Sequence, residues 1–381
     1  MKNNDLFKIQ LYSGSLLNND ILNLYPKKVI EKSPNKNWGE LIEVTIPLND
    51  LSKIQALMVK HYEGPEPWYL NGCGVNESKK ILCAFGKDDG NNGKIFVFDS
   101  ENLMEYTKIL QYGLSKNIPF KVMDFMEIIP KLTERIYTDL QNKYDKNYQK
   151  DSLRFFKEPV KILGVRSPIV KKILREYLPV IKLLDKNKIY DICEELFSLG
   201  FSETTSVALD ILHMTKNQVQ SDFNVYELWL KKYISNWGNC DDFCTHAFGE
   251  LIFNYPEYLS KTKFWAESKN RWFRRASAVV LIYSLRKGKY LKNAFDTADI
   301  LLKDNDDLVQ KGYGWMLKEA GNIYQKEVFG YVMKNKFSMP RTALRYAVEK
   351  MPEKIKKEVM EKNLPPNRAK LGVPLKAERK T

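Results

Sequence analysis

The stretch from Trp237 to Arg275 gathers residue types that could act on a nucleic-acid backbone. It contains three tryptophans, two adjacent carboxylates and three arginines, namely Trp237, Trp265, Trp272, Asp241, Asp242, Arg271, Arg274 and Arg275. Aromatic faces stack on bases, fixed cations attract phosphates, and a carboxylate can stabilise a sugar that develops positive charge. The combination suits a nucleic-acid backbone that carries a reactive sugar.

The same side chains also have a structural interpretation. Asp241 and Asp242 could be acidic first-turn residues that complement a helix dipole, with Asn239 as the N-cap. Trp272 lies on an apolar helical stripe and Trp265 ends a helix, which favours the core for both. From the residues alone, the structural role of the two carboxylates is the simpler interpretation.

The chain has few histidines and cysteines that could act in catalysis or bind a metal ion. Cys240 and Cys244 share a helix face while His246 points elsewhere, and no second ligand pair follows, so buried thiols are expected rather than a metal site. The chain has 3 histidines, too few for a multi-histidine site, and 5 cysteines, an odd number that argues against a disulfide framework.

Length and charge favour a multidomain protein with a polyanionic partner. The 381 residues suffice for two or three domains, and 61 Lys and Arg against 47 Asp and Glu give a net charge of +14. The sequence has no run of eighteen apolar residues, and Met1 to Asp5 lacks the apolar stretch of a signal peptide. We expect a cytoplasmic protein that does not enter a membrane.

The first 130 residues alternate between strand and helix patterns. Strands are predicted at Leu41–Ile46, Lys80–Phe85, Lys94–Phe98 and Phe120–Phe125, with helices that begin after Asn49 or Asp50 and after Ser100. The two middle strands flank a Gly- and Asn-rich turn and should form a hairpin. The order β-α-β-β-α-β is the ferredoxin-like arrangement, so residues 1–130 are predicted to form an α+β domain of unknown role. RNA binding, regulation and protein docking all stay open for it.

After a polar segment from Thr133 to Asp151, strand signals end. Short helical patterns joined by tight loops follow one another from Pro168 to Lys362. Such a series predicts an α-solenoid of the HEAT or armadillo type over residues 131–363, whose concave wall could hold a duplex. Residues 364–381 are rich in proline and basic residues, and we expect a flexible tail that attracts phosphates.

The helical half resembles a known family over residues 150–355. The resemblance lies in several stretches in matching order, namely Phe155-Phe156 with Leu163–Pro168, Asn236–Asp241, Trp265-Ala266 with Trp272–Ala276, Gln310–Glu319 and Met339–Arg345. In these stretches the chain is similar to the AlkD-like DNA glycosylases of the DNA alkylation repair family. The resemblance implies an enzyme that excises N3- and N7-alkylated purines from duplex DNA.

The resemblance also implies roles for individual residues. Asp241 matches the family's catalytic carboxylate, which stabilises the oxocarbenium-like sugar and positions water, and Trp237 and Trp315 match tryptophans that pack on the lesion-bearing backbone. Arg275 matches a phosphate-contacting arginine. Further backbone contacts are expected from Arg274, Lys318 and Arg341. Arg274 and Lys318 could instead belong to a solvated charged face, and Arg341 could pair with Glu349.

The expected protein is therefore a monomeric DNA glycosylase whose partner is double-stranded DNA with alkylated bases, and which needs no metal or small-molecule cofactor. Gly238 departs from the family pattern, because active members commonly carry an aspartate after this tryptophan. The alternative is a non-catalytic helical-repeat scaffold that binds DNA or protein. In a third interpretation, the N-terminal domain senses a small ligand and controls the solenoid.

Overall fold

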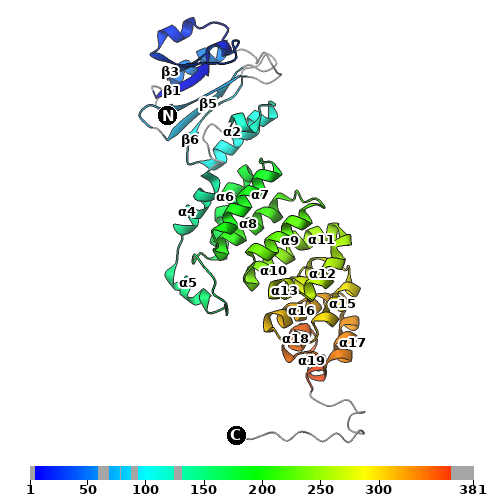
Figure 1. The fold of residues 1–381 in the computed structure, drawn as a ribbon. Helices are drawn as coiled ribbons and strands as arrows, with labels where there is room; N and C mark the ends of the chain where they lie inside the picture. Colours follow the sequence, from blue (N-terminus) through cyan, green and yellow to red (C-terminus); the bar gives the residue numbers. More distant parts are fainter. Residues whose placement is uncertain (1–4, 59–67, 78, 87–92, 124–130, 362–381) are drawn as a thin grey trace, which may run out of the picture. The chain divides into compact units, whose positions relative to one another are not determined.

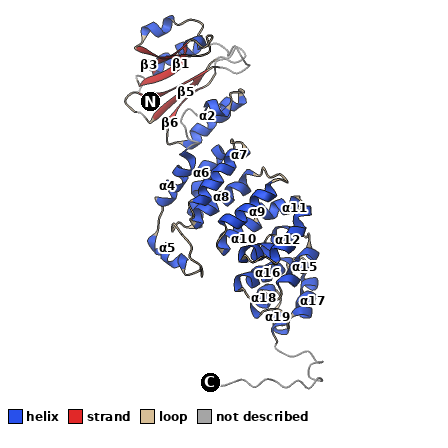
Figure 2. Cartoon of the chain, in the orientation of Figure 1, coloured by secondary structure: helices blue, strands red, loops and turns tan. Residues whose placement is uncertain are grey.

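The computed structural model describes residues 5–58, 68–77, 79–86, 93–123 and 131–361. The chain divides into two compact units, one formed by residues 1–149 with 163–196 and the other by residues 150–162 with 197–381. The named strands all lie in the first unit, and helices make up the second (Figure 2). No helix among the described residues is long and apolar enough to cross a membrane.

The first unit contains a six-stranded antiparallel sheet in the order β2-β3-β1-β4-β5-β6. Along β1 the burial alternates, so that Phe7, Ile9 and Leu11 face the core while their neighbours face out. The strands are β1 (Leu6–Tyr12), β2 (Lys27–Lys32), β3 (Glu40–Pro47), β4 (Tyr69–Gly74), β5 (Lys80–Phe85) and β6 (Ile95–Asp99).

Two helices cover opposite faces of this sheet (Figure 1). Helix α1 (Leu51–Leu57) packs with Leu82 and Ala84 in the main core of the sheet. Helix α2 (Leu103–Ser115) lies on the other face, where the rings of Phe85 and Tyr112 are 4.9 Å apart. Strands β5 and β6 pair antiparallel, which confirms the predicted hairpin, and residues 87–92 of its turn lie outside the described residues. Successive residues of β5 alternate between the two faces of the sheet.

The ferredoxin-like arrangement is wrong. The described part of the predicted strand Phe120–Phe125 forms helix α3 (Phe120–Met123), and residues 124 and 125 lie outside the described residues. Met123 fills the space left by Gly113 of α2 and its carbonyl accepts a hydrogen bond of 2.9 Å from the hydroxyl of Tyr106. Tertiary packing thus overrides the strand propensity of this segment. Strands β1, β2 and β4 enlarge the sheet beyond the predicted order.

Strand β4 is not predicted from the sequence because it contains glycines in place of apolar residues. A Cβ on Gly72 would lie 2.3 Å from the carbonyl oxygen of Lys8, so only glycine lets β4 pair with β1 here. The cap of α2 also differs from expectation. Asn102, rather than Ser100, accepts the capping hydrogen bond, from the amide of Glu105.

The polar segment 133–151 contains helices as well. Helix α4 (Leu132–Gln141) buries Leu132, Ile136 and Leu140 and packs against α6 (Ser167–Ile181). Helix α5 (Lys146–Leu153) has no fully buried residue. Helix α7 (Lys186–Ser198) completes this part of the chain.

The second unit stacks its helices in two rows (Figure 1). In the first row α10 contacts α13, α13 contacts α16 and α16 contacts α18. Aromatic pairs join the second row, with Phe223 of α9 stacked on Trp265 of α12 and Phe295 of α15 stacked on Tyr331 of α17. The first row is α10 (Trp237–Thr245), α13 (Arg271–Val279), α16 (Asp307–Ala320) and α18 (Arg341–Ala347), and the second is α9 (Asp222–Tyr233), α12 (Leu259–Ala266), α15 (Leu291–Leu301) and α17 (Gln325–Asn335).

The helices predicted from Pro168 to Lys362 are confirmed within the described residues, which end at residue 361, with two breaks. The predicted tail 364–381 lies outside the described residues. One predicted helix divides into α10 and α11 (Ala247–Asn254) at His246, whose φ of −121° and ψ of −101° are not helical. Another divides into α13 and α14 (Ile282–Leu285). Helices α8 (Ser202–Thr215) and α19 (Glu353–Met360) complete the described set.

Close packing in the first row predicts the effect of a glycine substitution. A Cβ on Gly314 of α16 would lie 2.7 Å from the Cβ of Tyr346 and 2.8 Å from the carbonyl oxygen of Ala343, both in α18. We expect Gly314→Ala to force the two helices apart and to lower the free energy of unfolding by about 1–3 kcal/mol, measured by urea denaturation.

Gly330 of α17 is the matched control, because its Cβ would meet no atom within 4 Å. We expect Gly330→Ala to raise the free energy of unfolding by about 0.5–1 kcal/mol through helix propensity. Equal effects of the two substitutions would contradict the packing of α16 on α18.

Candidate functional site

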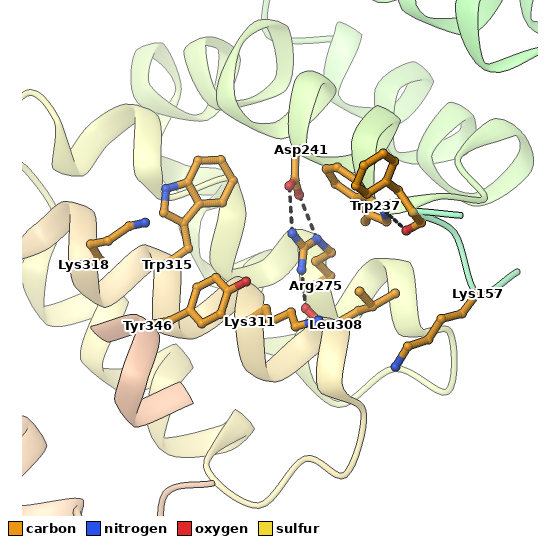
Figure 3. A pocket seen from close by; sticks show the side chains of 10 residues that line it. Lys157, Trp237, Asp241, Arg275, Leu308, Lys311, Trp315, Lys318 and Tyr346 are labelled. Atoms are coloured by element: carbon orange, nitrogen blue, oxygen red, sulfur yellow. Dashed lines mark hydrogen bonds and ion pairs between the residues drawn. The ribbon is translucent and has the colours of Figure 1, made fainter. Parts of the chain in front are cut away.

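A pocket of about 400 Å³ opens on the first row of helices of the second unit (Figure 3). Its walls come from α10, α13, α16 and α18 together with the segment 154–159, here called the strap. The lining residues are Phe155, Lys157, Trp237, Asp241, Arg275, Leu308, Lys311, Trp315, Lys318 and Tyr346.

Helix α10 places Trp237 and Asp241 on one face, since residues four apart lie one turn from each other. The helix begins after Asn236, whose side chain accepts a 2.9 Å hydrogen bond from the amide of Asn239. Asn236 is therefore the N-cap, and the expected cap Asn239 lies inside the helix. A Cβ on Gly238 would lie 3.3 Å from the cap oxygen of Asn236, so a larger residue there would require this oxygen to shift slightly.

Asp241 forms a bidentate ion pair with Arg275 of α13. Arg275 donates from Nε to Oδ1 at 2.8 Å and from Nη2 to Oδ2 at 2.7 Å, the parallel geometry in which guanidinium and carboxylate match best. Its Nη1 donates to the carbonyl oxygen of Leu308. Arg275 is only 5% exposed and packs 3.2 Å from where a Cβ on Gly312 would lie. Glycine at 312 thus makes room for this arginine.

The electrostatics of the pair leave Asp241 more basic than an ordinary aspartate. Burial raises the pKa of Asp241, and the charge and hydrogen bonds of Arg275 oppose this shift without cancelling it. The pKa of Arg275 is raised by the same ion pair, which outweighs its own burial. A fixed cation thus holds Asp241 in place, and the side chain of Asp241, which is 17% exposed, lines the pocket.

Both pocket tryptophans donate their indole N–H groups to the protein. Trp237 donates to the carbonyl oxygen of Phe155 at 3.2 Å and stacks on Phe156, with ring centroids 5.7 Å apart. Trp315 donates to Oε1 of Glu319 at 3.1 Å. A bound ligand thus meets the π faces and edges of these rings rather than a free N–H donor. Negative π faces favour a ligand that carries positive charge.

Three lysines surround the only carboxylate among the described lining residues, Asp241. Lys157 and Lys311 share Asp307 as a partner, at 2.7 Å and 3.3 Å. Lys318 pairs with Glu349 at 3.0 Å. The side chain of Lys157 is 67% exposed, and exposed ion pairs contribute little stability, so its ammonium group can turn to a phosphate at small cost. The side chain of Lys318 is only 14% exposed.

The structure brings five of the seven predicted site residues together. Trp237, Asp241, Arg275, Trp315 and Lys318 all line the pocket, and their functional roles stay predictions.

Arg274 and Arg341 are not among the lining residues. Arg274 pairs with Asp304 at 2.6 Å and donates to two backbone carbonyls, and Arg341 donates to the carbonyl oxygen of Met360. Both arginines thus bind other groups of the protein. Their contact with a nucleic-acid backbone stays a prediction.

The other two tryptophans of the opening stretch have core positions. Trp265 and Trp272 are buried, as are the thiols of Cys240 and Cys244. Among the described residues, no group of His, Cys, Asp and Glu could hold a metal ion. Asp242 turns from the pocket residues and binds His246, with 3.0 Å between Oδ1 and Nδ1.

Five lining residues are not among the predicted site residues, namely Phe155, Lys157, Leu308, Lys311 and Tyr346. A helical stripe could have revealed Lys311, because Leu308, Lys311, Trp315 and Lys318 recur at intervals of three and four along α16. No local pattern identifies Phe155 and Lys157, since the strap reaches the pocket only through tertiary contacts.

Comparisons with known proteins agree on one family. A family model of DNA alkylation repair enzymes matches residues 136–351, more than half of the chain. A solved structure described as a predicted DNA alkylation repair enzyme from Enterococcus faecalis is 14% identical in sequence, with a TM-score of 0.50 over 55% of this chain and 98% of that chain. At this identity the likeness shows the fold alone. The comparison with curated proteins gives no match.

The ion pair predicts a large loss of stability when its cation is removed. Arg275→Ala leaves the buried carboxylate of Asp241 without a counter-charge, and we expect the free energy of unfolding to fall by about 3–5 kcal/mol in urea denaturation. Arg154→Ala, which removes an exposed pair with Asp151, is the control and should cost at most about 1 kcal/mol.

Arg275→Ala in an Asp241→Asn background tests whether the unpaired carboxylate causes this loss of stability. In an Asp241→Asn protein the substitution Arg275→Ala leaves no carboxylate without a counter-charge, so it should lower the free energy of unfolding clearly less there than in the wild-type protein. An equal cost in both backgrounds would show that the arginine stabilises the fold through other contacts.

Proposed function

Because the chain belongs to the DNA alkylation repair enzyme family, we propose that it is a DNA glycosylase that excises cationic N3- or N7-alkylated purines from duplex DNA. One observation carries the proposal. A carboxylate held by a buried arginine lies in an open pocket together with two tryptophans whose N–H groups are already bound. This arrangement can stabilise positive charge on a sugar without contributing any covalent step of its own.

The proposed reaction breaks the bond between C1′ of the deoxyribose and the purine nitrogen. The bonding electron pair leaves with the base, whose own positive charge is neutralised, and the sugar takes on oxocarbenium character. Asp241 lies close enough to Arg275 to stay ionised and stabilises this charge, while it accepts a hydrogen bond from the attacking water. Water then adds to C1′ and releases one proton, which leaves an abasic site.

The other lining residues supply the binding surface. The faces of Trp237 and Trp315 offer negative π surface to the positively charged base or sugar. Lys157, Lys311 and Lys318 supply the cations for neighbouring phosphates. For Arg275 we propose a positioning role toward Asp241, because its guanidinium is already engaged by Asp241 and Leu308.

The two rows of helices are proposed to form a HEAT-like α-solenoid. The pocket lies on the first row and on the strap, with no lining residue from the second row. A duplex would then lie along the first row, with its damaged nucleotide at the pocket. The pocket opens to solvent, so the base can leave the duplex without first entering a closed cavity.

Substitution of the carboxylate tests the proposal directly. Asp241→Asn keeps the shape and a hydrogen bond to Arg275 but removes the charge, so we expect the single-turnover release of 3-methyladenine and 7-methylguanine from methylated duplex DNA to fall about a hundred-fold or more. Binding to the same duplex, measured by fluorescence anisotropy, should persist.

Asp242→Asn is the matched control, because Asp242 neighbours Asp241 in sequence but binds His246 and does not line the pocket. Its rate of base release should stay close to that of the wild-type protein. Tight binding of methylated DNA by the wild-type protein without detectable release would favour the non-catalytic scaffold instead.

The raised pKa of Asp241 predicts the acid limb of the pH profile. Base release requires the ionised carboxylate, so the single-turnover rate should fall as the pH falls through a pKa above the ordinary aspartate value of about 3.9. Spontaneous depurination of the same DNA without protein is subtracted at each pH. A rate that stays constant down to pH 4 would contradict the assignment of Asp241.

A further inference from the structure

The indole of Trp315 is held by a carboxylate outside the lining of the pocket. Glu319 follows Trp315 by one turn of α16, and its side chain is 9% exposed. In Figure 3 the nitrogen of Trp315 lies on the side of the indole away from Asp241. While this nitrogen donates to Glu319, the benzene ring of the indole faces Asp241.

Glu319 is itself fixed by several donors. Arg286, which follows α14, donates from Nε to Oε2 at 3.0 Å, and Asn322 donates to the same oxygen at 3.4 Å. The ammonium group of Lys350 lies 3.5 Å from Oε1. Burial acts to raise the pKa of Glu319, but the hydrogen bonds and charges of its partners outweigh it and lower the pKa. The acceptor is therefore charged and held from three parts of the fold.

We propose that Glu319 is a positioning residue that fixes the ring orientation of Trp315 for base excision, an inference that rests on the proposed function. The outer torsion of a tryptophan side chain has broad and nearly equivalent minima, so packing alone selects its orientation weakly. A hydrogen bond from Nε1 to a fixed carboxylate selects one of them. The ring then presents the same surface to every substrate.

The other pocket tryptophan provides an internal comparison. Trp237 donates to a backbone carbonyl, that of Phe155, and no side-chain substitution removes this acceptor. A change at Glu319 should therefore affect the indole of Trp315 and leave that of Trp237 unchanged.

The test is a double-mutant cycle on Glu319→Gln and Trp315→Phe, in which phenylalanine lacks the N–H group. We expect Glu319→Gln to lower the single-turnover rate of base release about ten-fold, the effect of one charge-assisted hydrogen bond. In the Trp315→Phe background the same substitution should change the rate by less than about two-fold. An equal fold-change in both backgrounds would overturn the proposal, because Glu319 would then act through the fold alone.

The indole resonances in ¹⁵N–¹H spectra test the contact itself, independently of base release. The Trp315 signal, assigned by its loss in Trp315→Phe, should exchange slowly with solvent in the wild-type protein and shift in Glu319→Gln, while the Trp237 signal stays in place. If the wild-type protein releases no base, the proposed function fails while these spectra still decide the contact. Rapid exchange of the Trp315 N–H in the wild-type protein would overturn the positioning role even where the variants do not fold.

Discussion

The buried ion pair between Asp241 and Arg275 is the interaction on which the pocket depends. It joins α10 to α13, and the third donor of Arg275 continues to the carbonyl of Leu308 in α16. Three helices of the first row thus meet at one guanidinium. The guanidinium is buried and the carboxylate is largely so, and both charges are tolerated because each satisfies the other. The bidentate geometry leaves little freedom for either.

Two glycines of α16 provide the space that close packing of the first row requires. Gly312 leaves space for the stem of Arg275, and Gly314 lets α18 approach closely. Neighbouring helices thus occupy the space beside both glycines, while Lys311, Trp315 and Lys318 of the same helix line the pocket.

Sequence patterns predicted the helical half well and the N-terminal half poorly, for physical reasons. In the helical half each helix buries one face at a spacing of three to four residues, so the signal is local. In the sheet, β2 is exposed on both faces and β4 relies on Gly72, so neither shows alternation of apolar residues. Trp237, Asp241, Arg275 and Trp315 could be found because the stretches around them resemble the repair family. Phe155 and Lys157, and the bond of the Trp237 indole to Phe155, depend on contacts between segments far apart in the sequence.

The chain passes back and forth between its two compact units, since residues 150–162 belong to the second and residues 163–196 return to the first. A single truncation point therefore cannot separate them. A fragment that begins at residue 150 would keep α6 but lose its partners α2 and α4, which would expose apolar side chains such as Ile173 and Leu174 to water. Any fragment intended to carry the pocket alone would need the strap joined directly to α8, with the intervening helices left out.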